Sequence, residues 1–194
     1  PEATGRSLLI VVRTQGSDQP LRNVQVRAEI MNETGYQPAQ RLTTDEGGEC
    51  RLSLPGEKIR SVQLAAHCSG YVPQFVQWNV DTGDTLPTNY TIHLVEGARL
   101  GGVVRNEAGQ AVAGVKVRVP LVNAPSFGAR DRYSWPEQGN KPVLTDTEGH
   151  WEFIGVPPDV DLALVELDHP DYRKVRAGTG LLPGQATSQI SLDD

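Results

Sequence analysis

One nine-residue pattern occurs twice and constrains the fold more than any other feature of the sequence. Residues 145–153 read TDTEGHWEF, and residues 44–52, which lie 101 positions earlier, read TDEGGECRL. Asp146 and Gly149 suit a tight turn, because Asp can hydrogen-bond its own backbone and Gly accepts positive φ. Trp151 and Phe153 lie two apart, so a β-strand directs both to one face. The pattern predicts a turn followed by a half-buried strand in each half of the chain.

Other segments show the same two-residue period. In residues 23–30 the apolar side chains alternate with polar ones, which is typical of a half-buried strand. Gly (20) and Pro (14) together exceed one residue in six, which favours many turns over long helices. Residues 31–41 are polar and predict a loop. Further strands are predicted at 7–13, 59–66, 75–80, 90–94, 100–105, 115–118, 162–167 and 187–192, and helix should be almost absent.

A second correspondence supports a duplication. Residues 24–27 read VQVR and residues 115–118 read VKVR, at an offset of 91, and a longer insertion at 120–142 accounts for the later offset of 101. Short strands at regular spacing, separated by turn signals, predict β-sandwiches. We therefore expect an all-β chain of two tandem sandwich domains, residues 1–97 and 98–194. Their short junction lacks a Gly/Ser tract, so we expect limited freedom between them.

These residues resemble a known family. The pattern GVV at 102–104, GQAVAGVKV at 109–117, the 145–153 motif and Asp171-Tyr172 is similar to the carboxypeptidase regulatory-like domain. The resemblance covers residues 100–177 well and residues 8–80 more loosely, with Cys50 and Leu52 at positions that are usually aromatic. It implies a transthyretin-like, Ig-like Greek-key β-sandwich related to the B-type repeats of collagen-binding surface proteins. It also implies a non-catalytic module of a bacterial secreted, periplasmic or surface-attached protein.

Charge and hydropathy exclude two classes of partner. A net charge of −6 argues against nucleic acid, because phosphate binding needs a basic face. The longest aliphatic run, at residues 8–12, is far shorter than the ~20 residues of a membrane-spanning helix, so no membrane insertion is expected. The abrupt start at Pro1 leads us to expect a piece of a longer polypeptide, and the family resemblance implies an extracytoplasmic location.

The two cysteines leave two alternatives open. Cys50 and Cys68 are expected on the inward faces of neighbouring antiparallel strands. A disulfide between them would contribute about 3 kcal/mol in an oxidising compartment. The alternative is two buried free thiols packed as small apolar residues.

Candidate metal and catalytic residues do not form a recognisable set. The four histidines lack metal-ligand spacing, and loop aspartates such as Asp81 and Asp84 lack the dense spacing of a calcium loop. No Gly-x-Ser-x-Gly occurs, and the His-x-His of the similar intradiol dioxygenases is missing. The Lys–Asn crosslink of related pilin domains needs a first-strand Lys, which 7–13 and 100–105 lack. We therefore expect no enzyme, metal or cofactor.

The insertion at 120–142 is the candidate binding surface, because long loops on a rigid sandwich often carry function. Exposed rings could stack on a sugar while neighbouring charged groups bind its hydroxyls. The same aromatics could instead cover a sheet edge. The sequence thus predicts a non-catalytic spacer and protein-interaction module, with a carbohydrate-binding module as the alternative and an enzyme with an unrecognised site as a third. The tentative ligand-binding residues are Phe127, Arg130, Arg132, Tyr133 and Trp135.

Overall fold

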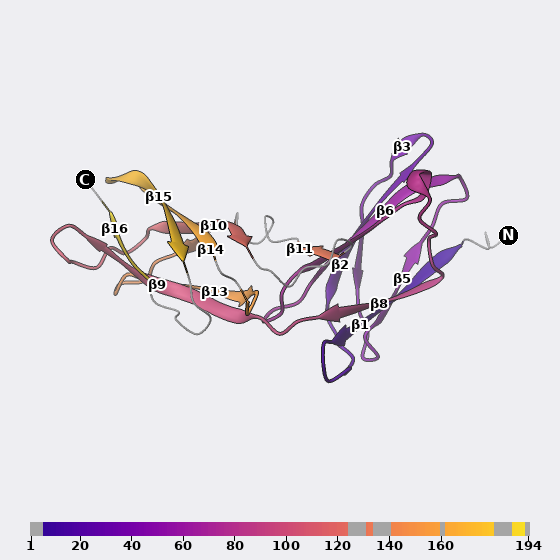
Figure 1. Ribbon diagram of the computed structural model, residues 1–194, viewed down its shortest axis with the longest axis horizontal. Coiled ribbons are helices and arrows are strands. Elements are labelled where there is room, and N and C mark those ends of the chain that lie inside the picture. The colour runs from indigo at the N-terminus through magenta and orange to yellow at the C-terminus, as the bar shows by residue number, and fades with distance from the viewer. Residues whose placement is uncertain (1–5, 124–130, 134–140, 160–161, 181–187, 193–194) are drawn as a thin grey trace. The chain divides into compact units, whose positions relative to one another are not determined.

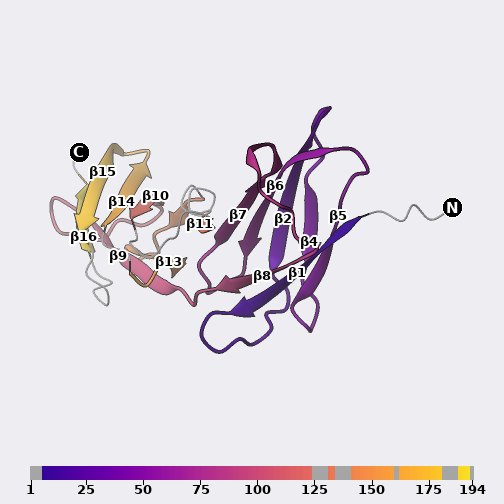
Figure 2. The ribbon, with the colours of Figure 1, turned by 45° about the vertical axis from the view of Figure 1, so that its right-hand side comes forward.

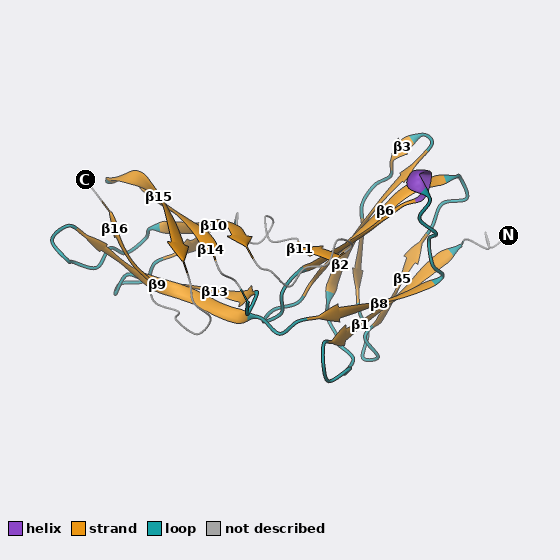
Figure 3. Ribbon diagram, in the orientation of Figure 1, coloured by secondary structure: helices purple, strands orange, loops and turns teal. Residues whose placement is uncertain are grey.

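The computed structural model describes residues 6–123, 131–133, 141–159, 162–180 and 188–192. The chain is nearly all β, and the 3-10 turn η1 (Val80–Thr82) is the one helical element in these ranges (Figure 3). It divides into two compact units: Pro1–Glu96 with Gly128–Tyr133, and Gly97–Phe127 with Ser134–Asp194.

The first unit contains two sheets. One has the strand order β5-β1-β8, built from β5 (Glu49–Ser53), β1 (Ser7–Thr14) and β8 (Asn89–Leu94). Strand β1 runs antiparallel to β5 and parallel to β8, and Figure 1 shows β1 and β8 side by side. The other sheet has the order β11-β7-β6-β2-β3, with β4 also paired to β2. Its strands are β2 (Gln25–Asn32), β3 (Gly35–Tyr36), β4 (Gln40–Thr43), β6 (Ile59–His67), β7 (Gln74–Asn79) and β11 (Asp131–Tyr133).

The two sheets of the first unit form a β-sandwich, whose layers are visible in Figure 2. Alternate residues of every long strand point inward, as the two-residue period predicts. Trp78 is buried and meets Tyr90 of the opposite sheet edge-on, with ring centroids 4.8 Å apart. The core is drawn from both layers: Leu8, Ile10, Val12, Leu52, Ile92 and Leu94 from one, and Val26, Ala28, Ile30, Val62, Leu64, Ala66, Val76 and Trp78 from the other.

The second unit pairs its strands in a corresponding order. Its sheets are β13-β9-β16 and β12-β10-β14-β15, with β9 antiparallel to β13 and parallel to β16. Trp151 and Phe153 are buried, with ring centroids 6.1 Å apart, as their spacing predicted. The strands are β9 (Ala98–Asn106), β10 (Lys116–Asn123), β12 (Val143–Leu144), β13 (His150–Val156), β14 (Leu162–His169), β15 (Tyr172–Gly180) and β16 (Ser188–Leu192).

The sequence-based expectation fails for residues 31–41 and for strand β15. Residues 31–41 are not a continuous loop, since they contain β3 and the start of β4, both paired to β2. Strand β15 was not predicted, because its first half, YRKVR, places polar residues on both faces and hides the two-residue period. Pairing with β14 along its length, rather than local pattern, makes it a strand.

Candidate functional site

The repeated motif is a hydrogen-bonded turn in both units. Asp45 Oδ1 accepts hydrogen bonds from the backbone N–H groups of Gly47 and Glu49, each at 2.9 Å. Asp146 Oδ1 accepts the corresponding bonds from Glu148 and His150, also at 2.9 Å. The N–H of His150, then that of Glu148, lowers the pKa of Asp146 by favouring its charged form. These carboxylates are therefore engaged in holding the turn.

The threonine before each aspartate fastens the turn to the neighbouring strand. Thr145 is buried, and its hydroxyl accepts a hydrogen bond from Val115 N–H at 2.9 Å while donating to Val112 C=O at 2.7 Å. Thr44 is also buried and does the same in the first unit, with Val24 N–H and Leu21 C=O at the same two distances. Buried polar groups need such partners, so Thr serves the fold here.

The glycine of the motif is required by space as well as by conformation. Gly48 and Gly149 have φ of +75° and +78°. A Cβ atom at Gly48 would lie 2.5 Å from Val12 O, and one at Gly149 would lie 2.5 Å from Val104 O. The motif that dominates the sequence is thus explained by the architecture of the turn.

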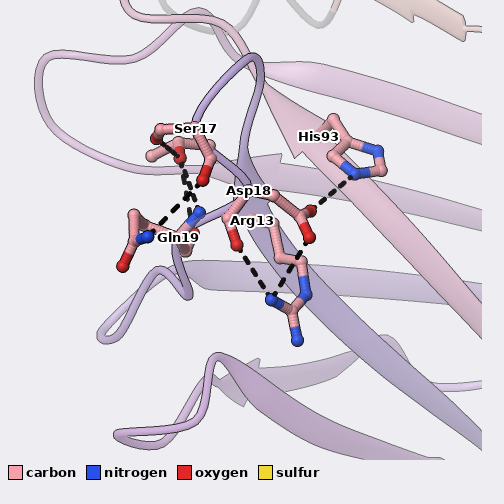
Figure 4. Close-up of polar contacts among 6 residues, drawn as sticks. Arg13, Ser17, Asp18, Gln19 and His93 are labelled. Carbon is pink, nitrogen blue, oxygen red and sulfur yellow. Dashed lines mark hydrogen bonds and ion pairs between the residues drawn. The ribbon is translucent and has the colours of Figure 1, made fainter.

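A polar cluster of side chains lies at the end of β1 in the first unit. Asp18 lies between Arg13 of β1 and His93 of β8 (Figure 4). Its Oδ1 is 3.3 Å from His93 Nε2, its Oδ2 is 3.7 Å from an Arg13 guanidinium nitrogen, and its carbonyl accepts from Arg13 at 2.8 Å. All three side chains are at least one-third exposed. The cluster links the two parallel strands by their side chains.

The cluster is not arranged as a hydrolytic triad. Ser17 is next to Asp18, but its hydroxyl hydrogen-bonds Thr14 Oγ1. Thr14 Oγ1 also accepts from Gln19 N–H at 3.0 Å. A serine nucleophile needs its hydroxyl beside the histidine that takes its proton. The hydroxyl of Ser17 closes the loop through Thr14, whereas Nε2 of His93 lies 3.3 Å from Asp18 Oδ1.

The predicted binding insertion is described only in part. Phe127, Arg130 and Trp135 lie outside the described residues. Arg132 and Tyr133 lie in β11, whose backbone pairs antiparallel with Phe75 and Gln74 of β7 and so extends a sheet edge. Sequence reasoning missed this strand because three residues, Asp-Arg-Tyr, are too few to show a period. A ligand-binding role for the five residues stays a prediction.

The expectation for the cysteines was wrong in one respect. Cys50 lies in β5 and Cys68 directly follows β6, and these strands belong to different sheets rather than to neighbouring positions in one. Both thiols are free and pack against the core of the first unit. Burial, with a contribution from Asp45, raises the pKa of Cys50 to about 11, and burial also raises that of Cys68. The chain crosses between sheets after β5, which a hairpin reading of the sequence does not anticipate.

The loop aspartates Asp81 and Asp84, which lack the spacing of a calcium loop, have partners within the protein. Asp84 Oδ2 accepts from Asn79 N–H at 2.8 Å, and Asp81 Oδ2 binds Arg60 Nε at 2.6 Å. Across the described ranges, no group of three or more His, Cys, Asp or Glu is placed to hold a metal ion. In the same part of the chain, none of the helical structure is long and apolar enough to cross a membrane.

Comparisons with known proteins find only distant structural likeness. No protein-family model and no curated protein matches the chain. The shaft pilin SpaA of Lactobacillus rhamnosus GG is 14% identical over 98% of both chains, with a TM-score of 0.40. A streptococcal ancillary pilin is 11% identical over 100% of this chain and 63% of its own, with a TM-score of 0.45. The minor pilin of Streptococcus agalactiae is 14% identical over 97% of this chain and 95% of its own, with a TM-score of 0.42. Likeness at this level does not assign a family, so the β-sandwich description rests on the strand pairing and the core.

Proposed function

We propose that this chain is a non-catalytic spacer and protein-interaction module of a larger extracytoplasmic protein. One observation carries the spacer role: the strand with which each unit begins pairs in parallel with a later strand of that unit, β1 with β8 and β9 with β16. The chain enters β1 at Ser7 and reaches the end of β8 at Leu94, which lies opposite Thr14. Thr14 is seven residues further along β1 than Ser7, so entry and exit lie at opposite ends of the paired strands. At about 3.3 Å per residue this separates entry and exit by roughly 23 Å. A unit with its ends on opposite sides lengthens a polypeptide.

The corresponding contacts of the two units support two tandem copies of one sandwich, spanning residues 1–97 and 98–194. The Thr and Asp hydrogen bonds of the turn recur at equivalent atoms 101 residues apart. The sheet orders β5-β1-β8 and β13-β9-β16 also correspond. With the resemblance of residues 100–177 to carboxypeptidase regulatory-like domains, we infer a transthyretin-like sandwich for each copy, the first being the more divergent.

The spacer role is tested by the distance between the ends of one unit. Spin labels at Ser7→Cys and Glu96→Cys report that distance by double electron–electron resonance. Cys50 and Cys68 are replaced by Ala so that only these two positions are labelled. The strand rise predicts a narrow distribution near about 25–30 Å. A mean below about 15 Å, or a distribution as broad as that of the denatured chain, is incompatible with a rigid spacer.

The carbohydrate alternative makes a different prediction from the same chain. Glycan-array binding that is lost on Trp135→Ala would assign sugar recognition to the 120–142 insertion and replace the spacer as the main role. Tyr36→Ala is a matched control, because Tyr36 is an exposed aromatic of β3, outside the insertion. Absence of binding to every glycan supports the spacer.

A further inference from the structure

The parallel strand pair of each unit, β1 with β8 in the first and β9 with β16 in the second, forms a clamp. In the first unit, six consecutive residues of β1, Leu9 to Thr14, lie in register with Asn89 to Leu94 of β8. Backbone bonds close both ends of this ladder, Leu9 N–H to Thr88 O at 3.0 Å and Gln15 N–H to Leu94 O at 2.9 Å. In the second unit, Gly102 to Asn106 of β9 lie in register with Ser188 to Leu192 of β16, which is one residue pair fewer among the described residues.

The direction of the chain determines how such a ladder responds to tension. Force applied along the polypeptide enters β1 at Ser7 and leaves β8 at Leu94, at opposite ends of the paired strands. The strands are then pulled past each other, and all ladder hydrogen bonds are loaded together. If force were instead applied at neighbouring ends, the bonds would open one after another. Parallel bonds are evenly spaced along the strands, so no single position takes the load in the first case.

Burial adds resistance to sliding of these strands. Ile10 and Val12 of β1 and Ile92 and Leu94 of β8 are each at most 1% exposed. A shift of one residue would turn every inward side chain of the moving strand toward solvent, because side chains alternate between faces. The ladder and the core therefore yield together.

We propose that the chain is a load-bearing tether whose units resist tension through the β1–β8 and β9–β16 clamps. This inference deepens the proposed spacer function and rests on it. Its partner would be the larger structure to which the two ends of the module are attached and which pulls them apart.

The two clamps are not equally reinforced. Arg13 donates to Asp18 O at 2.8 Å, and its counterpart Arg105 donates to Gly109 O at 2.9 Å. In the first unit the residue that accepts this bond also carries a carboxylate, and Asp18 Oδ1 reaches His93 of the partner strand at 3.3 Å. In the second unit the corresponding acceptor is Gly109, which has no side chain. His93 lies opposite Arg13 in the first unit, and the residue opposite Arg105 in the second is the uncharged Ser191. The second unit should therefore open first under force.

The clamp is tested by pulling single molecules of the full chain from two directions. One arm pulls between the N- and C-termini, which shears both clamps. The other pulls between the N-terminus and a handle at Asn89→Cys, opposite Leu9, which peels β1 from β8. Both arms carry Cys50→Ala and Cys68→Ala, and circular dichroism confirms that they fold alike. Shearing of the first unit should need a severalfold higher force than peeling. Equal forces in the two directions overturn the clamp, although the end-to-end distance at zero force can still support a rigid spacer.

The order of opening is tested in the same instrument. Terminal pulling should give two events, each releasing about 300 Å of chain for roughly 90 residues. Gly149→Ala should lower the force of the unfolding event of the second unit, or remove the event, and so identifies which event belongs to that unit. In the unmodified chain this event should occur at the lower of the two forces. The variant Asp18→Gly with His93→Ser should bring the force of the first unit close to that of the second. Glu46→Gln is the matched control, because it removes an exposed ion pair with Arg22 that does not join β1 to β8. Opening of the first unit before the second, or equal effects of the two changes, overturns the assigned hierarchy.

Discussion

Replacing Thr145 by Val should destabilise the second unit by about 3 kcal/mol while hardly changing its shape. Val matches Thr in volume but removes the hydroxyl that bonds Val115 N–H at 2.9 Å and Val112 C=O at 2.7 Å. Both backbone groups would then lack this partner in a region where Thr145 is only 5% exposed. An unsatisfied buried donor or acceptor costs about 1–3 kcal/mol, so the pair accounts for the expected total.

The measurement is urea unfolding followed by tryptophan fluorescence in a Trp135→Phe background. Trp78 then reports the first unit and Trp151 the second, since each is buried in its own core. For a unit of this size, 3 kcal/mol corresponds to a fall in Tm of roughly 12–24 °C. The transition of Trp78 should not move. Thr44→Val should produce the mirror-image result, because Thr44 makes the same two bonds.

Two further variants separate the hydroxyl from packing. Thr145→Ser keeps the hydroxyl and loses one methyl group, so its cost should be only about 1 kcal/mol. Thr147→Val lies two residues along the same turn, is exposed, and should change stability by less than about 0.5 kcal/mol. If Thr145→Val costs no more than Thr145→Ser, the hydrogen bonds are not what stabilises the motif, and the account of the turn is wrong.

Three other predictions follow from single residues. Gly48→Ala should destabilise the first unit by about 3 kcal/mol or more, because φ is +75° and the new Cβ would lie 2.5 Å from Val12 O. The control Gly56→Ala should hardly change stability in the same denaturation assay, because no atom lies within 4 Å of the new Cβ. Asp146 has a lowered pKa in the folded chain, so its stabilisation is present above its unfolded pKa and is lost as pH falls through the folded one. In Asp146→Asn, the free energy of unfolding of the second unit should therefore fall less steeply as pH is lowered from neutral to acidic values. An unchanged pH dependence, or an equal change in the control Glu107→Gln, would contradict this. The pKa of Cys50 is raised from 9.0 to about 11, so the folded state favours its neutral thiol. The resulting contribution to the free energy of unfolding is fully present below pH 9 and is lost as pH rises toward 11. Alkylation of Cys50 by iodoacetamide at pH 8, followed by mass spectrometry, should be much slower in the native chain than in urea, and equal rates would show that its thiol is not shielded.

Local sequence pattern was sufficient for the features that depend on neighbouring residues. The turn of 145–153 was predictable because Asp and Gly act on their own backbone within four residues. The burial of Trp151 and Phe153 followed from their spacing, and the inward faces of β2 and β13 followed from the same two-residue period. The all-β character was predictable for the same reason, since no segment has the period of a helix.

Tertiary structure decided whatever depends on which strands meet. Cys50 and Cys68 belong to different sheets because the chain crosses over after β5, and no local signal distinguishes that crossing from a hairpin. The short strand β11 exists through its pairing with β7, and β15 through its pairing with β14. The cluster of Arg13, Asp18 and His93 joins residues 75 positions apart and arises only because β1 and β8 are parallel neighbours. Sequence period determines which face of a strand is apolar, whereas the partner of that strand is selected by the packing of the whole core.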